Sequence, residues 1–328
     1  MTSFKAYLTS QEGKSTKTEL VDMTLDQLDA GEVLIRTEYS TVNYKDALSA
    51  TGAGRIIRRF PCIGGVDLAG VVESSSDAAF KRGDAVIAHA YDVGVAHHGG
   101  YAEMARVPAA WCVPVPAGMS TYDAMTHGTA GFTAALAIHR MQHDGLAPAN
   151  GPVLVNGATG GVGIVAIEIL AKLGYHVVAV TGKEKDTELL KSVGAKEVLI
   201  RGQFEMTEKP LGAETYAGAV DNLGGEQLSW LTRVMKVGGT IASIGLAQGW
   251  EVKTTVMPFI LRGVSLLGID SVNCTMALRR ELWRKLANEW KCDKLSGHCK
   301  TVSFAELPNV FDAYVKGAVT GRTVVKIG

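Results

Sequence analysis

A glycine-rich turn in the middle of the chain lies between an apolar strand and an apolar helix, and no other feature constrains the fold as strongly. The strand is expected at 153–155, the turn at 156–163 and the helix at 164–173. Further apolar strands alternate with helices as far as residue 269. Strands with near-continuous apolar character, separated by helices at this spacing, predict a parallel sheet that is covered on both faces.

The two ends of the chain have a different pattern, of short β-strands with little helical periodicity before about residue 121. The expected strands of the sheet in the middle are 153–155, 177–180, 197–200, 217–220, 240–244 and 264–269, with helices at 164–173, 184–193 and 225–235. Outside it we expect strands at 33–40, 70–73, 84–88 and 321–327 and helices at 121–139, 276–290 and 304–316. The simplest architecture is an α/β one, in which a doubly wound Rossmann domain at 125–270 is inserted into a β-rich domain formed by 1–124 and 271–328.

The glycine-rich turn has the context of a dinucleotide-binding site. Gly160 and Gly163 fill the second and third positions of the GxGxxG pattern, whereas Ala158 replaces the first. A glycine at 160 lets the backbone approach a pyrophosphate, and one at 163 allows close packing of helix on strand. The N–H groups and the dipole at the helix start then attract phosphate. We expect contacts from Thr159, Gly160, Gly161 and Val162; a glycine-rich turn without a ligand is the alternative.

The tip of the next strand selects the cofactor. An NAD site usually has Asp or Glu about 20 residues after the glycines, which binds the ribose 2′-hydroxyl. Here the tip is Thr181-Gly182-Lys183, without an acid. A hydroxyl, an amide and an ammonium group favour a 2′-phosphate, and Arg201 can stack on the adenine or add a second charge. The sequence therefore predicts NADPH, although Lys183 and Arg201 could also be solvated surface residues.

Composition excludes several other classes of protein. Lys plus Arg (33) equals Asp plus Glu (33) in 328 residues, so no overall field favours nucleic acid or an anionic membrane. The five cysteines are scattered without a CxxC pair, which argues against a disulfide framework or a structural zinc site. There is no signal-peptide pattern and no apolar run of about 18 residues. We expect a cytoplasmic protein.

With these elements in place, the chain resembles the medium-chain dehydrogenase/reductase superfamily along nearly its whole length. The matching segments are 64–72 (GGVDLAGVV), 99–103 (GGYAE) and 321–325 (GRTVV). The resemblance implies that the β-rich domain is a GroES-like catalytic domain. Zinc enzymes of this superfamily have a Cys and a His–Glu pair at the places held here by Asn43 and by Val66 and Asp67. Because valine cannot bind zinc and the four-cysteine lobe is missing, we expect no metal.

Within the superfamily, four segments resemble the acryloyl-CoA reductase group of the quinone oxidoreductase-like branch. They are 43–48 (NYKDAL), 55–61 (RIIRRFP), 181–183 (TGK) and 255–264 (TVMPFILRGV). Lys183 departs from the group, in which Arg is common, and this change could loosen the phosphate clamp. The resemblance implies reduction of the double bond of a short enoyl-CoA by NADPH without metal. The alternatives are an NADPH:quinone oxidoreductase and an NADPH-binding structural protein with little turnover.

The resemblance also suggests site residues. Tyr44 follows the position that faces the nicotinamide in relatives, so it could bind cofactor, position substrate, supply the proton or simply pack. Asp46 and Lys45 could orient that loop, cap a helix or lie on the surface. Leu246 and Ser271 follow the ends of later strands and should line the nicotinamide pocket, and Ile260 is carried over from the group.

Two expectations concern other contacts. Arg55, Arg58 and Arg59 form the densest basic cluster and could bind the phosphates of coenzyme A, or be a solvated loop. His97 and His98 are adjacent, hence badly placed to share a metal, and a surface loop is expected there. The apolar strand at 264–269 resembles the one that joins two sheets in dimeric relatives, so a homodimer is expected.

Overall fold

The structure is a computed structural model that describes residues 3–13 and 15–328. Contacts within the chain divide it into two compact units. The β-rich unit contains residues 1–129, 272–288 and 296–328, and the sheet unit contains residues 130–271 and 289–295. The expected boundaries at 124/125 and 270/271 thus differ by five residues and by one, and residues 289–295, expected in the β-rich domain, group with the sheet unit.

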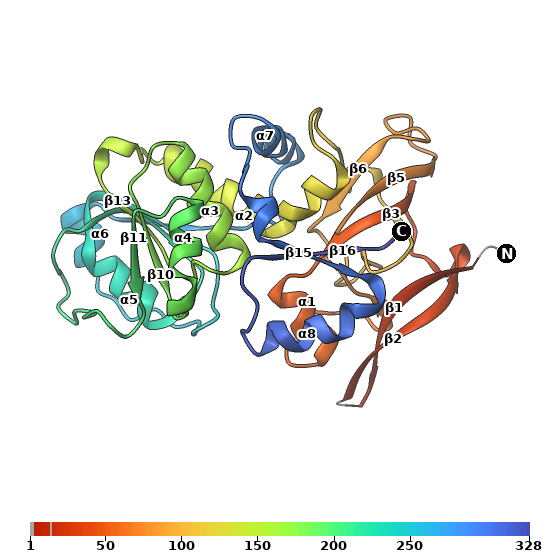
Figure 1. The fold of residues 1–328 in the computed structure, drawn as a ribbon, viewed down its shortest axis with the longest axis horizontal. Helices are drawn as coiled ribbons and strands as arrows, with labels where there is room; N and C mark the ends of the chain where they lie inside the picture. Colours follow the sequence, from red (N-terminus) through yellow and green to blue (C-terminus); the bar gives the residue numbers. More distant parts are fainter. Residues whose placement is uncertain (1–2, 14) are drawn as a thin grey trace. The chain divides into compact units, whose positions relative to one another are not determined.

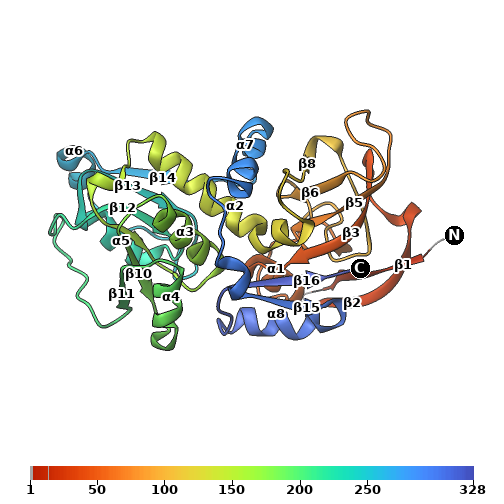
Figure 2. The ribbon, with the colours of Figure 1, turned by 45° about the horizontal axis from the view of Figure 1, so that its top comes forward.

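The sheet unit has six strands in the order β11-β10-β9-β12-β13-β14, and all neighbouring strands are parallel. The strands are β9 (Val153–Val155), β10 (Val177–Thr181), β11 (Glu197–Ile200), β12 (Tyr216–Asp221), β13 (Met235–Ser243) and β14 (Ser265–Gly268). The helices are α3 (Gly161–Lys172), α4 (Thr187–Val193), α5 (Gly225–Val234) and α6 (Met257–Arg262). α3 and α4 cover one face of the sheet and α5 and α6 the other (Figures 1 and 2). The expected Rossmann arrangement is confirmed.

The strand order changes direction between β9 and β12. From β9 the chain moves through β10 to β11 at one side, and from β12 it moves through β13 to β14 at the other. Ligands of open α/β sheets bind at such a switch point, outside the carboxyl ends of the strands. The strands are buried there because both faces are covered: β9, β10 and β12 contain only buried residues.

The β-rich unit contains two sheets. One has the order β2-β1-β4, and the other has the order β15-β16-β3-β5-β6-β8, with β7 paired to β3. The strands are β1 (Ser3–Glu12), β2 (Ser15–Thr24), β3 (Val33–Thr41), β4 (Cys62–Ile63), β5 (Asp67–Ser75), β6 (Ala85–His89), β7 (Met104–Val107), β8 (Cys112–Pro114), β15 (Cys299–Ser303) and β16 (Arg322–Lys326). β16 pairs antiparallel with β3, so the two ends of the chain form one sheet.

The helices outside the parallel sheet are α1 (Tyr44–Thr51), α2 (Thr121–His143), α7 (Met276–Ala287) and α8 (Leu307–Val315). Short 3₁₀ turns lie at Leu25–Gln27, Ala109–Trp111, Pro148–Asn150, Glu184–Asp186, Leu295–His298 and Phe304–Glu306. α2 is kinked at Gly128, where φ is 51°. A Cβ at this position would lie 2.6 Å from a methyl of Thr41 and 2.9 Å from the Asp67 carboxylate, so only glycine fits.

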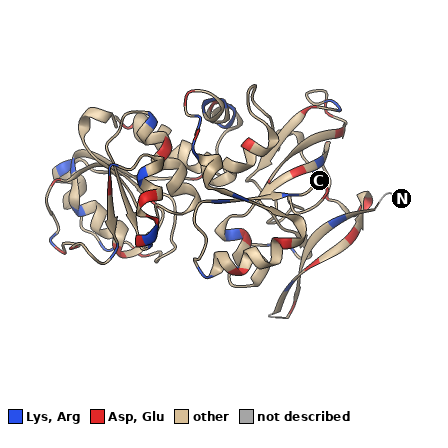
Figure 3. Ribbon diagram, viewed as in Figure 1, with Lys and Arg blue, Asp and Glu red and all other residues tan. Residues whose placement is uncertain are grey.

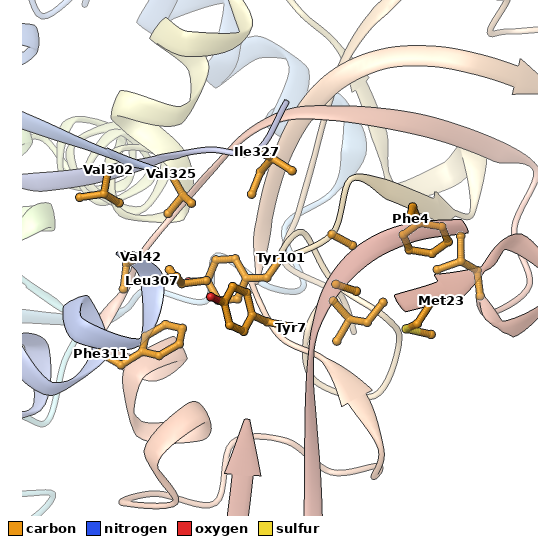
Figure 4. Close-up of a cluster of buried hydrophobic side chains, with 14 of the residues drawn as sticks. Phe4, Tyr7, Met23, Val42, Tyr101, Val302, Leu307, Phe311, Val325 and Ile327 are labelled. Carbon is orange, nitrogen blue, oxygen red and sulfur yellow. The ribbon is translucent and has the colours of Figure 1, made fainter. Parts of the chain in front are cut away.

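An apolar cluster joins segments from both ends of the chain in the β-rich unit. Figure 4 shows the rings of Tyr7, Tyr101 and Phe311 next to one another, with Val325 close by. The rings of Tyr101 and Phe311 have their centroids 5.7 Å apart. Because Phe311 belongs to α8, this cluster holds the C-terminal helix against the N-terminal strands.

Charges of both signs are interspersed over both units (Figure 3). No helix among the described residues is long and apolar enough to cross a membrane.

Candidate functional site

The glycine-rich turn forms the start of α3 as predicted. Gly160 is the N-cap residue and the helix begins at Gly161. A Cβ on Gly163 would lie 2.5 Å from the carbonyl oxygen of Gly157, so close packing requires glycine there. At Gly160 only that same oxygen lies within 4 Å of an added Cβ, at 3.2 Å. The chain's own packing constrains position 160 less than position 163, which suits a glycine that makes room for a ligand.

The first turn of α3 has the properties of an anion site. N–H groups at the start of a helix have no partner within the helix, and the helix dipole adds partial positive charge. Thr159 lies directly before the N-cap and is largely buried. Thr159, Gly160, Gly161 and Val162 are thus next to one another at the carboxyl end of β9, where a pyrophosphate group fits.

The structure brings together the four residues predicted to select the cofactor. The N–H of Lys183 donates to Oγ1 of Thr181 at 3.0 Å. The N–H of Arg201 donates to the Thr181 carbonyl at 2.8 Å. The guanidinium of Arg201 lies over Gly182, since a Cβ there would be 2.6 Å from its Nη2 atom. Partial burial lowers the pKa of Lys183. A hydroxyl and two cationic side chains therefore lie around the tip of β10.

Asn156 and Asp221 connect two strand ends, which the sequence reasoning missed. The Asn156 amide donates to the buried Asp221 carboxylate at 2.5 Å, and its oxygen accepts from the N–H of Asn222 at 2.6 Å. The N–H of Gly224 donates to the same carboxylate at 3.1 Å. Burial raises the pKa of Asp221. This network connects the glycine-rich turn to the start of α5. Polar residues directly after apolar strands were the feature of the sequence that could have indicated it.

The three residues expected near the nicotinamide lie in different environments. Leu246 follows β13 and is 65% exposed, and Ser271 follows β14 and is buried. Both positions come after the carboxyl ends of strands, as the switch-point rule requires. Ile260 lies on α6 and is 71% exposed. Their contact with a nicotinamide stays a prediction.

A buried polar network occupies the positions that zinc ligands hold in related enzymes. Nδ2 of Asn43 donates to Asp67 at 2.7 Å and to Asp46 at 3.0 Å. The other oxygen of Asp67 accepts the N–H of Thr129 at 3.0 Å and its hydroxyl at 2.5 Å. Arg322, also buried, donates to Thr41 at 2.7 Å and more weakly to the Asn43 oxygen at 3.5 Å. Sequence reasoning nominated neither Thr129 nor Arg322.

The charges of this network are only partly balanced. Two buried carboxylates, Asp46 and Asp67, lie in this network with the buried side chain of Arg322, and the charge of Lys45 also acts to lower the pKa of Asp46. Burial, and then the charge of Asp67, raise the pKa of Asp46 to about 6. Hydrogen bonds from Asn43 oppose this shift in the Asp46 pKa.

The donor set does not fit a zinc ion. Zinc in such sites takes Cys, His or carboxylate ligands, at least three from the protein. Asn43 directs its N–H groups at the two carboxylates, and Val66 offers only its backbone N–H, which donates to Asp46 at 3.0 Å. Within residues 3–13 and 15–328, no three His, Cys, Asp or Glu side chains are grouped to hold a metal.

Tyr44 is the first residue of α1 and is 48% exposed. The residues that flank it are fixed: the N–H of Asn43 donates to the Asp46 carboxylate at 2.8 Å, and the N–H of Asp46 donates to the Asn43 carbonyl at 3.0 Å. Of the roles considered for Asp46, helix capping is the one observed. Lys45 is partly exposed. The anchored helix start presents the Tyr44 side chain at the surface of its unit.

The basic cluster is partly neutralised. Arg58 forms an ion pair with Asp92, and Arg59 forms one with Asp29. Arg55 is exposed, and no ion pair of its side chain is found in the described part of the chain. Arg55 is thus the member of the cluster best able to bind an incoming phosphate.

His97 and His98 are buried, so the expectation of a surface loop is wrong. Nε2 of His97 lies 3.0 Å from the carbonyl of Ala30, and Nδ1 of His98 accepts the N–H of Ile63 at 3.0 Å. The N–H of His98 donates to Asp29 at 2.6 Å. These bonds hold the loop in place and leave both rings with structural roles.

All five cysteines are free thiols, and four of them are buried.

Comparisons with known proteins agree with this geometry. Residues 29–117 match the model of the alcohol dehydrogenase GroES-like domain, and residues 161–289 match that of the zinc-binding dehydrogenases. The chain is 44% identical to the acrylyl-CoA reductase AcuI of Ruegeria pomeroyi over 327 residues, which are 99% of each chain. The putative quinone oxidoreductase YhfP of Bacillus subtilis is also 44% identical, over 99% of each chain.

Two solved structures of other proteins are also similar to this chain. The yhdH oxidoreductase of Salmonella enterica, in complex with NADP, has a TM-score of 0.96 and 42% identity, over 99% of this chain and 100% of that one. The structure of Bacillus subtilis yhfP with NAD bound has a TM-score of 0.97 and 43% identity, over 100% of both chains. The chain therefore belongs to the medium-chain dehydrogenase/reductase superfamily, in its quinone oxidoreductase-like branch of nicotinamide-dependent oxidoreductases.

Proposed function

We propose that this protein uses NADPH to reduce the α,β double bond of a short enoyl-CoA, acryloyl-CoA first, to the saturated thioester. The observation that carries the proposal is identity of 44% to an acrylyl-CoA reductase over 327 residues, which are 99% of this chain. The donors of the polar network around Asn43 do not fit zinc, which is consistent with conjugate reduction, a reaction that needs no metal to bind an alkoxide.

The cofactor residues of the sheet unit are the glycine-rich turn and the strand tip. Thr159, Gly160, Gly161 and Val162 would bind the pyrophosphate. Thr181, Gly182, Lys183 and Arg201 would bind the 2′-phosphate, because no carboxylate at the tip repels it. We further assign Leu246, Ile260 and Ser271 to the nicotinamide end.

Bound NADPH supplies a hydride to the β-carbon of the acyl group. The protein must then stabilise negative charge on the thioester oxygen and deliver a proton to the α-carbon. In the β-rich unit Tyr44, a half-exposed residue, carries a hydroxyl on an anchored helix start. It could donate a hydrogen bond to the thioester oxygen, supply the proton or hold the cofactor, and Arg55 would bind a phosphate of coenzyme A.

A steady-state comparison of substrates tests this function. With NADPH, we expect acryloyl-CoA to be reduced with far higher kcat/KM than a simple quinone. Rapid turnover of the quinone with acryloyl-CoA inert would establish the quinone reductase instead, the activity that YhfP's name suggests for that relative. Binding of NADPH without turnover of either substrate would indicate a structural protein.

We also propose a cytoplasmic homodimer. β14 is the last strand of the parallel sheet, and Leu266 on it is 39% exposed. An open apolar edge invites pairing with a second chain, and five free thiols suit a reducing compartment. Light scattering at micromolar concentration should give a dimer, and Leu266→Lys should shift it towards monomer.

A further inference from the structure

Lys45 follows Tyr44 in the first turn of α1 and carries a cationic group that no other side chain binds. The residue is partly buried. In the part of the chain that the structure describes, its ammonium forms no hydrogen bond and no ion pair. A partly buried cation on a fixed helix start, without a partner of its own, is available to an anionic group of a ligand.

The acids of the neighbouring network bind other donors and leave Lys45 unpaired. Asp46 accepts the backbone N–H groups of Asn43 and Val66, at 2.8 Å and 3.0 Å. Asp67 accepts the side-chain amide of Asn43 at 2.7 Å. These bonds fix the start of α1, so the backbone of Lys45 is held in place while its ammonium remains available.

The side chain of Lys45 lies near the end of β6. Asp67, which Asn43 binds, is the cross-strand neighbour of His89, the last residue of β6. Burial, then the charge of Arg279 and then that of Lys45 lower the pKa of His89. Coulomb interactions weaken with distance, so a charge that acts on this buried ring lies close to it.

The region around Lys45 has a net positive charge. The ring of His89 is neutral and accepts hydrogen bonds at Nε2 from Trp283, at 2.9 Å, and from Arg279, at 3.0 Å. It therefore offers Lys45 no negative charge. Even with both acids of the network ionised, three cations (Lys45, Arg279 and Arg322) lie there with two anions. Such a region favours negative charge on a bound ligand.

The proposed reaction creates negative charge at one atom of the substrate. When a hydride adds to the β-carbon of the enoyl thioester, the electrons of the double bond shift towards the carbonyl, and its oxygen becomes an enolate oxygen. The α-carbon then takes a proton that derives from solvent, and the carbonyl forms again. A cationic donor at this oxygen stabilises the enolate more than the neutral substrate, which lowers the barrier.

We propose that the ammonium of Lys45 donates a hydrogen bond to the thioester oxygen and stabilises the enolate, so that Lys45 is a catalytic residue. The inference rests on the proposed function. A charged donor binds a developing anion more strongly than a neutral hydroxyl does. Tyr44 is adjacent in sequence, but neighbouring residues of a helix do not face each other, so its role is a separate question.

Kinetics of Lys45→Met and Lys45→Arg test this proposal. Methionine removes the charge, whereas arginine keeps a cationic donor. Lys45→Met should lower kcat for acryloyl-CoA about 10²–10³-fold, the usual effect of losing an oxyanion donor. Lys45→Arg should retain at least about a tenth of the wild-type kcat. Lys81→Met, in an exposed turn before β6, is the control and should behave as the wild type.

Two further measurements separate catalysis from other roles of Lys45. The Kd for NADPH, measured without substrate, should be the same in Lys45→Met as in the wild type. The melting temperature should also be unchanged, because the ammonium has no partner within the chain. Weaker NADPH binding with kcat retained would make Lys45 a cofactor residue. A clearly lower melting temperature, with kcat equally low in Lys45→Arg, would make it a structural one.

The wild type distinguishes this proposal from the proposed function. If the wild type reduces acryloyl-CoA and Lys45→Met does so equally fast, Lys45 takes no part in the reaction while the proposed function stands. If the wild type does not reduce acryloyl-CoA, the proposed function and the role of Lys45 are both wrong.

Discussion

The side-chain amide of Asn43 donates a 2.7 Å hydrogen bond to the buried carboxylate of Asp67. The same nitrogen donates to Asp46, so one neutral amide serves two carboxylates. Asn43→Ala would leave both acids short of a donor and remove the capping residue of α1. We expect a loss of about 2–4 kcal/mol in the free energy of unfolding, measured with urea. Asn309→Ala, at an exposed position of α8, is the control; a similar small effect of both substitutions would contradict this role of Asn43.

Asp46 should make stability depend on pH. Its pKa is raised to about 6 in the folded protein from an ordinary 3.8, because of burial first and of Asp67 second. The folded state therefore binds this proton more tightly than the unfolded state. The resulting stabilisation is complete below about pH 4 and is lost as the pH rises through 6; for a difference of this size it is about 3 kcal/mol at most.

Asp46→Asn should remove that dependence. The amide oxygen of the substituted side chain can still accept a hydrogen bond. The second carboxylate oxygen is lost as an acceptor, and this loss lowers the free energy of unfolding equally at pH 4 and at pH 7. Relative to the wild type, the variant should thus be more stable at pH 7 than at pH 4, as measured by urea midpoints. Asp22→Asn on the exposed face of β2 should follow the wild-type profile. An Asp46→Asn profile parallel to the wild type would show that folding does not raise the pKa of Asp46.

The parallel sheet was predictable because its signal is local. Strands buried on both faces must be apolar throughout, as in Val153–Val155, and β9, β10, β12 and β13 are each followed by a helix of the sheet unit. The candidate phosphate residues were nominated from the same local signal, since Gly160 lies in the turn between β9 and α3 and Lys183 lies two residues after β10.

The β-rich unit was less predictable because its contacts are distant in sequence. α1 has only eight residues and is held by the Asn43–Asp46 cap and by α8, so its periodicity is too short to detect. His97 appeared exposed because its partner Ala30 is 67 residues away. Arg322 belongs to the buried polar network around Asn43. Nothing near Arg322 in the sequence indicates that its strand, β16, pairs with β3.

Lys183→Asp should convert the strand tip from attracting to repelling a 2′-phosphate. We expect the wild type to bind NADPH much more tightly than NADH, and the variant to lose at least about 1–3 kcal/mol of NADPH affinity. Isothermal titration with each cofactor measures both values. Lys185→Asp makes the same charge change two residues further along and should have a smaller effect. Equal affinity of the wild type for the two cofactors would refute the proposed phosphate site.

Arg55→Ala should raise the KM for acryloyl-CoA and leave kcat nearly unchanged. A remote contact that is equally strong in the ground state and the transition state lowers KM and leaves kcat unchanged, so its loss should raise KM alone. Arg58→Ala is the comparison, because Asp92 already pairs with that guanidinium, and the KM should rise less. Steady-state kinetics at fixed, saturating NADPH measure both. A larger rise in KM for Arg58→Ala than for Arg55→Ala would reverse the assignment.

Tyr44→Phe should separate the roles that its position allows. The substitution removes one hydroxyl from a half-exposed ring, so stability should change little and kinetics should report the function. If the hydroxyl stabilises charge on the thioester oxygen, kcat should fall about 10²–10³-fold, the usual effect of removing an oxyanion donor. If it only holds the cofactor, the KM for NADPH should rise while kcat persists. Tyr39→Phe controls for loss of a hydroxyl on the neighbouring strand β3. Unchanged kcat and KM in Tyr44→Phe would leave Tyr44 as a packing residue and exclude it from the reaction.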